Sequence, residues 1–108
     1  MQTGTRDSVY SIVASIVLAA VAMPVHAQGD AAQARDLAAT CANCHGTGGK
    51  AAQGAVPALA GQSKADLVQK MNEFRDGKRT ATIMHQLAKG YTPEQVDLIA
   101  GWFAQQKP

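Results

Sequence analysis

The chain is short, weakly basic and poor in aromatic residues. It has 108 residues, ten Lys and Arg against eight Asp and Glu, and 5% aromatic residues. This length, without an internal repeat, predicts one domain. An excess of two positive charges with no basic stripe is too small for a nucleic-acid-binding surface, so nucleic acid is excluded as a partner.

The first 27 residues are typical of a secretory signal peptide. An almost unbroken apolar run extends over Ile12–Met23, and Val25-His26-Ala27 has small residues at the −3 and −1 positions of a cleavage site. The alternative is an uncleaved membrane anchor, but the run is shorter than the about 18 residues that a spanning helix needs. We therefore expect residues 1–27 to be removed on export to the periplasm, which leaves a domain of residues 28–108 without a membrane span.

A first helix is predicted over about residues 31–44, with Asp30 as its N-cap. Apolar side chains recur at i, i+3, i+4 and i+7 from Ala34 to Cys41. The apolar face of this helix therefore leads directly to a cysteine.

That cysteine opens the pentapeptide Cys41-Ala42-Asn43-Cys44-His45, the C-x-x-C-H pattern of covalent c-type haem attachment. Positions i, i+3 and i+4 share one face of a helical turn. Two thiols can therefore add to the two vinyl groups of one haem while the imidazole reaches its iron. The pattern predicts one covalent haem c, attached through Cys41 and Cys44, with His45 as an axial iron ligand.

Two cysteines are also compatible with a disulfide, a zinc site or a thiol redox pair. A four-cysteine zinc site needs a second pair of cysteines, which the sequence lacks. A Cys2His2 site needs two suitably spaced histidines, and beyond His45 only His85 is a candidate. A thioredoxin-like pair follows a strand in a βαβ unit, whereas the flanks here are rich in alanine and helical in pattern. Haem attachment is the better interpretation.

Glycines after His45 predict a loop over residues 46–62. Its apolar stretch Val56–Gly61 is expected to pack on the haem, or alternatively on the protein core. Ser63 is the predicted N-cap of a second helix, which Gly77 ends.

Met84 and His85 follow this second helix. A methionine on a loop or short turn can be directed at an iron, and beside a C-x-x-C-H pattern it becomes a candidate sixth ligand. His85 is the alternative and would give a two-histidine iron of lower potential. Adjacent side chains point in different directions, so both cannot bind the same iron at once.

The last helix has the clearest start signal in the chain. Thr92 is the predicted N-cap, Pro93 the first helical residue and Gln95 the third, and the helix extends to about Gln105. Its apolar stripe comprises Val96, Ile99, Ala100 and Phe103. No useful strand pattern occurs, so the predicted fold class is all-α.

With these motifs the chain resembles the class I c-type cytochromes. The resemblance rests on the C-x-x-C-H pattern, on Pro57 twelve residues after His45, on Met84, and on the terminal helix with Trp102 and Phe103. It implies a small fold of three main helices plus short turns around one haem, with the first and last helices crossing. It also implies that the Pro57 carbonyl accepts a hydrogen bond from His45, and that Met84 is the sixth ligand.

A narrower resemblance is to the cytochrome subunit of flavocytochrome c sulfide dehydrogenase and to single halves of related two-haem cytochromes. It rests on residues 56–62, 74–79, 82–84 and 88–92. It implies a non-catalytic electron carrier that accepts electrons from a flavin-containing subunit during sulfide oxidation. The single C-x-x-C-H pattern departs from the two-haem members.

Two other functions are compatible with the sequence. The first is a diffusible cytochrome that shuttles electrons between periplasmic or membrane redox partners. The second is a haem enzyme or gas sensor with an open sixth site, which requires that Met84 does not bind the iron.

Overall fold

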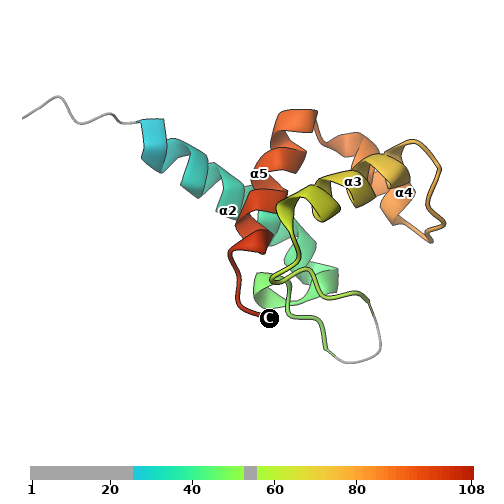
Figure 1. Cartoon of the computed structure of the whole chain (residues 1–108), viewed down its shortest axis with the longest axis horizontal. Coiled ribbons are helices and arrows are strands. Elements are labelled where there is room, and N and C mark those ends of the chain that lie inside the picture. The colour runs from blue at the N-terminus through green and yellow to red at the C-terminus, as the bar shows by residue number, and fades with distance from the viewer. Residues whose placement is uncertain (1–25, 53–55) are drawn as a thin grey trace, which may run out of the picture.

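The computed structural model describes residues 26–52 and 56–108, so the predicted signal peptide lies outside it except for its last two residues. The described residues contain helices and no strand, which confirms the all-α prediction of three main helices plus short turns (Figure 1). The helices are α2 (His26–His45), α3 (Lys64–Arg75), α4 (Met84–Leu87) and α5 (Pro93–Ala104), with 3-10 turns at Thr47–Gly49 and Ala88–Gly90. Within these ranges, no helix is both long and apolar enough to span a membrane.

Helix α2 begins earlier than the sequence predicted. It already includes His26, where the described residues begin, so Asp30 lies inside the helix and the predicted N-cap is wrong. The alanine-rich sequence around Asp30 favours continuation of the helix over a start at this point. The C-terminus follows the prediction, because Gly46 has a φ of 82° and donates its N–H to the Ala42 carbonyl at 3.0 Å. A Cβ atom at Gly46 would collide with the Lys50 carbonyl.

Helices α3 and α5 begin at the predicted caps. The Ser63 hydroxyl accepts a hydrogen bond from the Asp66 N–H at 3.1 Å. At α5, the Thr92 hydroxyl accepts from the Gln95 N–H at 3.2 Å, and the Gln95 side chain accepts from the Thr92 N–H at 3.0 Å. This reciprocal capping box satisfies two backbone donors that the first turn would otherwise leave free.

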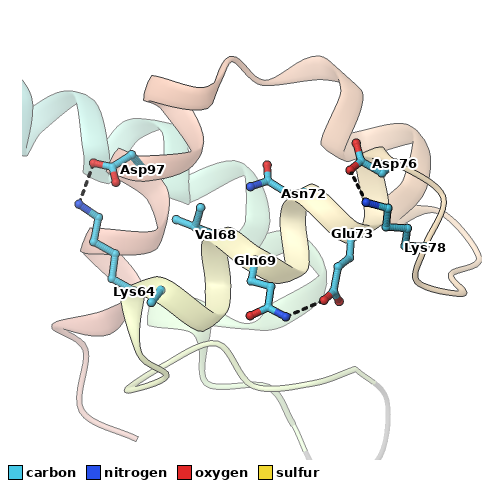
Figure 2. A pocket seen from close by; sticks show the side chains of 9 residues that line it. Lys64, Val68, Gln69, Asn72, Glu73, Asp76, Lys78 and Asp97 are labelled. Atoms are coloured by element: carbon cyan, nitrogen blue, oxygen red, sulfur yellow. Dashed lines mark hydrogen bonds and ion pairs between the residues drawn. The ribbon is translucent and has the colours of Figure 1, made fainter.

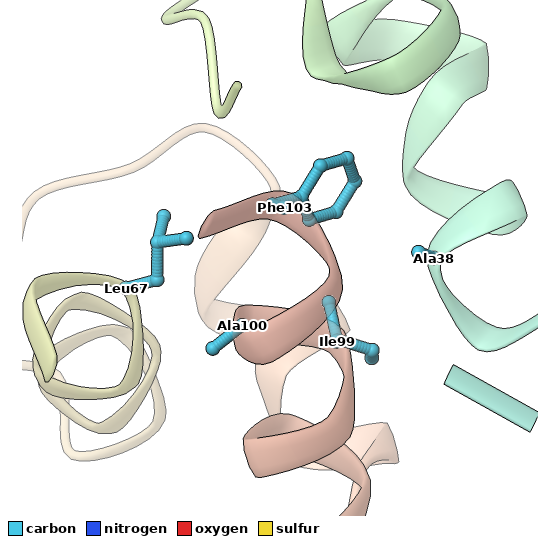
Figure 3. Close-up of a cluster of buried hydrophobic side chains, with 5 residues drawn as sticks. All are labelled: Ala38, Leu67, Ile99, Ala100 and Phe103. Carbon is cyan, nitrogen blue, oxygen red and sulfur yellow. The ribbon is translucent and has the colours of Figure 1, made fainter. Parts of the chain in front are cut away.

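The core forms where α5 packs between α2 and α3, as Figure 3 shows. Its buried cluster consists of Ala38 from α2, Leu67 from α3, and Ile99, Ala100 and Phe103 from α5. Phe103 is only 1% exposed, and its ring meets that of Trp102 edge to face at a centroid distance of 5.0 Å. The small side chain of Ala38 allows α2 to approach α5 closely, as the resemblance implied for the first and last helices.

Candidate functional site

The last turn of α2 carries the three residues that the sequence singled out. Cys41 is half-buried and packs against the core cluster, whereas Cys44 is exposed. Both side chains are free thiols. His45 is the final residue of the helix and is half-buried. The helix therefore places two thiols and one imidazole at positions i, i+3 and i+4, on one face of its C-terminal turn.

The environment of Cys41 disfavours thiol redox chemistry. Burial raises the pKa of the Cys41 thiol above its ordinary value, although the hydroxyl of Thr40 acts in the opposite direction. Reactive thiols in redox pairs have lowered pKa values because the thiolate is the nucleophile. A raised pKa at Cys41 is the opposite of this pattern, which argues against the thiol redox alternative.

His45 is oriented by the loop that follows it. Its Nδ1 atom lies 2.7 Å from the carbonyl oxygen of Pro57, a distance at which Nδ1–H donates a hydrogen bond. This contact leaves Nε2 as the nitrogen available to a metal. The loop around Pro57 is itself held, since the N–H of Leu59 donates to the Gly49 carbonyl at 2.8 Å and the N–H of Gly61 donates to the Phe103 carbonyl at 3.1 Å. The hydrogen bond that the resemblance implied for Pro57 is therefore present.

Met84 is the first residue of α4 and is half-buried, so, of the predicted loop or short turn, it lies on a short helical turn. The Ile83 carbonyl closes this turn by accepting from the N–H groups of Gln86 at 2.9 Å and Leu87 at 3.1 Å. His85 is also half-buried, and its Nδ1 atom is buried without a hydrogen-bond partner among the described residues. Figure 1 shows α4 beside α3. Met84 and His85 therefore lie on a different helix from the two cysteines, which are on α2.

A contact that sequence reasoning missed connects these two parts of the site. The hydroxyl groups of Thr40 and Tyr91 lie 2.8 Å apart, which joins the residue before Cys41 to the segment between α4 and α5. The Arg75 guanidinium also donates to the Tyr91 carbonyl at 3.1 Å. These residues are 51 and 16 positions apart, so no local pattern could have predicted the pairs.

An open groove runs along the outer face of α3 (Figure 2). Its charged side chains are already paired, as in the Lys64–Asp97 ion pair at 2.7 Å and the Lys78–Asp76 pair at 3.4 Å. Glu73 accepts hydrogen bonds from Gln69 and Arg79 at 2.8 Å, which hold the pKa of this carboxyl below its ordinary value. The groove therefore offers no free charge to a ligand, and the candidate site remains at the end of α2.

The residues at that end fit a covalent haem. Two free thiols three residues apart lie on one turn of the helix, as in the C-x-x-C-H pattern, and the imidazole of His45 keeps one nitrogen for an iron. Two large apolar side chains near Met84 are solvent-exposed, Ile83 by 55% and Leu87 by 45%, and a large apolar ring would give them a surface to pack on.

Comparison with known proteins identifies the family. The family model of cytochrome c matches residues 31–107. The chain is 40% identical to a cytochrome c4 of Pseudomonas aeruginosa over 76% of its own length and 41% of that protein. It is also 40% identical to the cytochrome subunit of sulfide dehydrogenase of Chlorobaculum tepidum, over 62% of its length and 60% of that protein.

A third relative is the thiosulfate dehydrogenase electron acceptor of Thiomonas intermedia, which is 36% identical over 66% of this chain and 33% of that protein. The chain thus covers between one third and three fifths of the length of these relatives. With the geometry of the α2 terminus, the comparison shows that this chain belongs to the cytochrome c family of electron carriers, whose cofactor is a covalent haem c.

Proposed function

We propose that this protein transfers single electrons through one haem c that is attached to Cys41 and Cys44, with His45 and Met84 as axial ligands. When bound, the haem supplies an iron that alternates between the ferric and ferrous states. The observation that carries the proposal is the 2.7 Å contact between His45 Nδ1 and the Pro57 carbonyl. This hydrogen bond fixes the tautomer and the orientation of the ring, and it raises the basicity of the nitrogen that remains for the metal.

Met84 is the proposed sixth ligand, and His85 is the alternative. Successive residues of a helix point about 100° apart, so a turn that directs one of these side chains at the iron turns the other away. A thioether ligand opposite a histidine raises the reduction potential, which suits a carrier that accepts electrons. Filling both axial positions would also leave no open site for a substrate or a gas on the iron.

The optical spectrum of the ferric protein tests this ligand set. We expect a red-region band from sulfur bound to iron, which disappears in Met84→Ala and persists in His85→Gln. Absence of the band from the wild-type protein, with a spectrum that changes in His85→Gln and not in Met84→Ala, would indicate that His85 is the sixth ligand instead. Tight binding of carbon monoxide by the ferrous wild-type protein would contradict the carrier and favour a sensor or enzyme.

We further propose that the electrons come from a flavin-containing subunit that oxidises a reduced sulfur compound. The support is the similarity to a cytochrome subunit of sulfide dehydrogenase and to an electron acceptor of thiosulfate dehydrogenase. The alternative is a freely diffusing carrier, supported by the equal identity to a cytochrome c4. Purification from the native cell distinguishes them, since a subunit would co-purify with flavin absorbance and a free carrier would elute as a lone haem protein.

Export to the periplasm is part of the proposal. It is supported by the apolar run and the small residues of the predicted signal peptide, residues 1–27. N-terminal sequencing of the purified protein should begin at Gln28. A protein that retains Met1 would contradict cleavage at this site and favour the anchor.

A further inference from the structure

The side chain of Gln62 connects the Pro57 loop to α3. Its Nε2 atom donates a hydrogen bond to the carbonyl oxygen of Ala58. Its Oε1 atom accepts one from the ammonium group of Lys70, at 2.5 Å. Both Gln62 and Lys70 are half-buried, so the bond between them is partly shielded from water, whereas the bond from Gln62 to Ala58 is exposed. This row of hydrogen bonds ends one residue away from Pro57, whose carbonyl holds His45.

A backbone contact acts on the same part of the loop. The N–H groups of Leu59 and Ala60 donate to the carbonyl of Gly49, at 2.8 and 3.2 Å. The Leu59 N–H and the Ala58 carbonyl belong to one planar peptide unit, so Gly49 and the Gln62 amide hold this unit at its two polar atoms. The Pro57 carbonyl belongs to the preceding peptide unit, which is joined to this one through the Cα atom of Ala58. Holding the second unit at both polar atoms therefore limits the movement of the first, which accepts from His45.

We propose that Gln62 and Lys70 are positioning residues that help set the reduction potential by holding the Pro57 carbonyl against His45. The inference rests on the proposed function, because it requires His45 to be an iron ligand. A well-aligned carbonyl acceptor makes the imidazole more basic, which favours ferric iron and lowers the potential. The charge on Lys70 strengthens the row, since an ammonium donor polarises the amide that it contacts.

The first test is a substitution that leaves the net charge of the protein unchanged. Gln62→Leu removes both hydrogen bonds without changing the charge, so the potential should rise as the His45 bond loosens. We expect about a threefold change in the ratio of reduced to oxidised protein, which is about 28 mV at 59 mV per tenfold. The direct reporter is solvent exchange of the His45 Nδ1–H proton in the ferrous protein, which should become faster.

The matched pair Lys70→Gln and Lys64→Gln separates the row from simple loss of charge. Both lysines lie on α3, and Lys64 pairs with Asp97 of α5 rather than with the loop (Figure 2). Loss of a positive charge lowers the potential in both variants, but only Lys70→Gln should speed exchange of the His45 proton. Lys70→Arg, which keeps a charged donor, should restore slow exchange.

Two results would overturn the inference. One is that Gln62→Leu keeps the reduction potential and the His45 proton-exchange rate of the wild-type protein. The other is that the His45 proton exchanges at the same rate in Lys70→Gln as in Lys64→Gln. If Gln62→Leu does not fold, the lysine pair alone decides. Failure of the proposed function would be seen separately, as absence of the red-region band from the wild-type ferric protein, before any of these variants is compared with it.

Discussion

Truncation of Phe103 tests how the core supports the helical turn that carries Cys41. The ring is 1% exposed and packs in the cluster that joins α2, α3 and α5, and Cys41 contacts this same cluster. The loop that follows the haem-binding turn also rests on it, since a Cβ atom at Gly49 would lie 2.7 Å from the Phe103 ring. We therefore predict that Phe103→Ala loosens the packing of the last turn of α2 as well as that of α5.

The loss of unfolding free energy in Phe103→Ala depends on whether neighbouring groups can move into the cavity that the ring leaves. Phe-to-Ala changes in cores cost about 3–5 kcal/mol, and the upper end applies where the surroundings cannot close the cavity. Here the backbone at Gly49 is held by hydrogen bonds from Leu59 and Ala60, so the loop cannot easily move inward. The edge-to-face contact with Trp102 adds about 0.5–1.5 kcal/mol to what the area alone would give. We expect a loss of about 4–5 kcal/mol.

A loss of this size is a large part of the total free energy of unfolding. A domain of this length is stable by about 4–12 kcal/mol, at 0.05–0.15 kcal/mol per residue. Guanidinium and thermal unfolding of the haem-loaded protein measure the change, and the melting temperature should fall by at least about 16 °C. Phe103→Leu, which keeps most of the apolar volume, should lose much less and keeps the test informative if Phe103→Ala does not fold.

Leu98→Ala is the matched control, because Leu98 lies on α5 outside the buried stripe and is only half-buried. If Phe103→Ala destabilises the protein no more than Leu98→Ala does, then the ring does not carry the packing described here. The reasoning that links α5 to the haem-binding turn would then be refuted.

Three further changes test other contacts. Thr92→Ala removes the cap of α5 and should cost about 1 kcal/mol in denaturant unfolding; an unchanged midpoint would show that the capping box is not formed. Tyr91→Phe removes the hydroxyl bonded to Thr40 and should cost about 0.5–1.5 kcal/mol by the same assay, with no loss if Thr40 is already Val. At Glu73, hydrogen bonds led by that from Gln69 hold the pKa below its ordinary 4.5. The resulting stabilisation is present above pH 4.5 and is lost as the pH falls through the lower pKa of the folded state. Glu73→Gln should therefore lower the melting temperature slightly at neutral pH but not in acid. A loss of melting temperature in Glu73→Gln that becomes larger as the pH is lowered would contradict this prediction.

Sequence reasoning was accurate where a few neighbouring residues decide the structure. Thr92, Pro93 and Gln95 form a complete start signal, and α5 begins as they predict. Asp30 failed as a cap because a single capping residue does not stop a helix that alanine-rich neighbours can extend. Met84 was expected on a loop or short turn after the second helix, and it lies at the start of the four-residue helix α4.

Of the contacts around His45, the one with Pro57 could be predicted and those that involve Gln62 and Lys70 could not. The partner Pro57 was accessible through a family resemblance, which carries information about tertiary structure that no local pattern contains. Gln62 and Lys70 have no distinctive local pattern, because their roles depend on a loop and a helix that fold back on each other. A glutamine after a glycine and a lysine within a helix have no distinctive role in the sequence, and the fold brings them together next to the Ala58 carbonyl.

The composition of the core leads us to expect that the turn with the two cysteines also matters for stability. Of the nine buried hydrophobic residues in the described part of the chain, five are alanines, which remove little apolar area from water. The larger ones are Leu67, Val96, Ile99 and Phe103. A domain of about 80 residues with so few large core side chains usually requires a cofactor or cross-link for stability. A covalent apolar ring attached beside Cys41 would enlarge this cluster at its edge, so the group that carries the electron is also expected to complete the core.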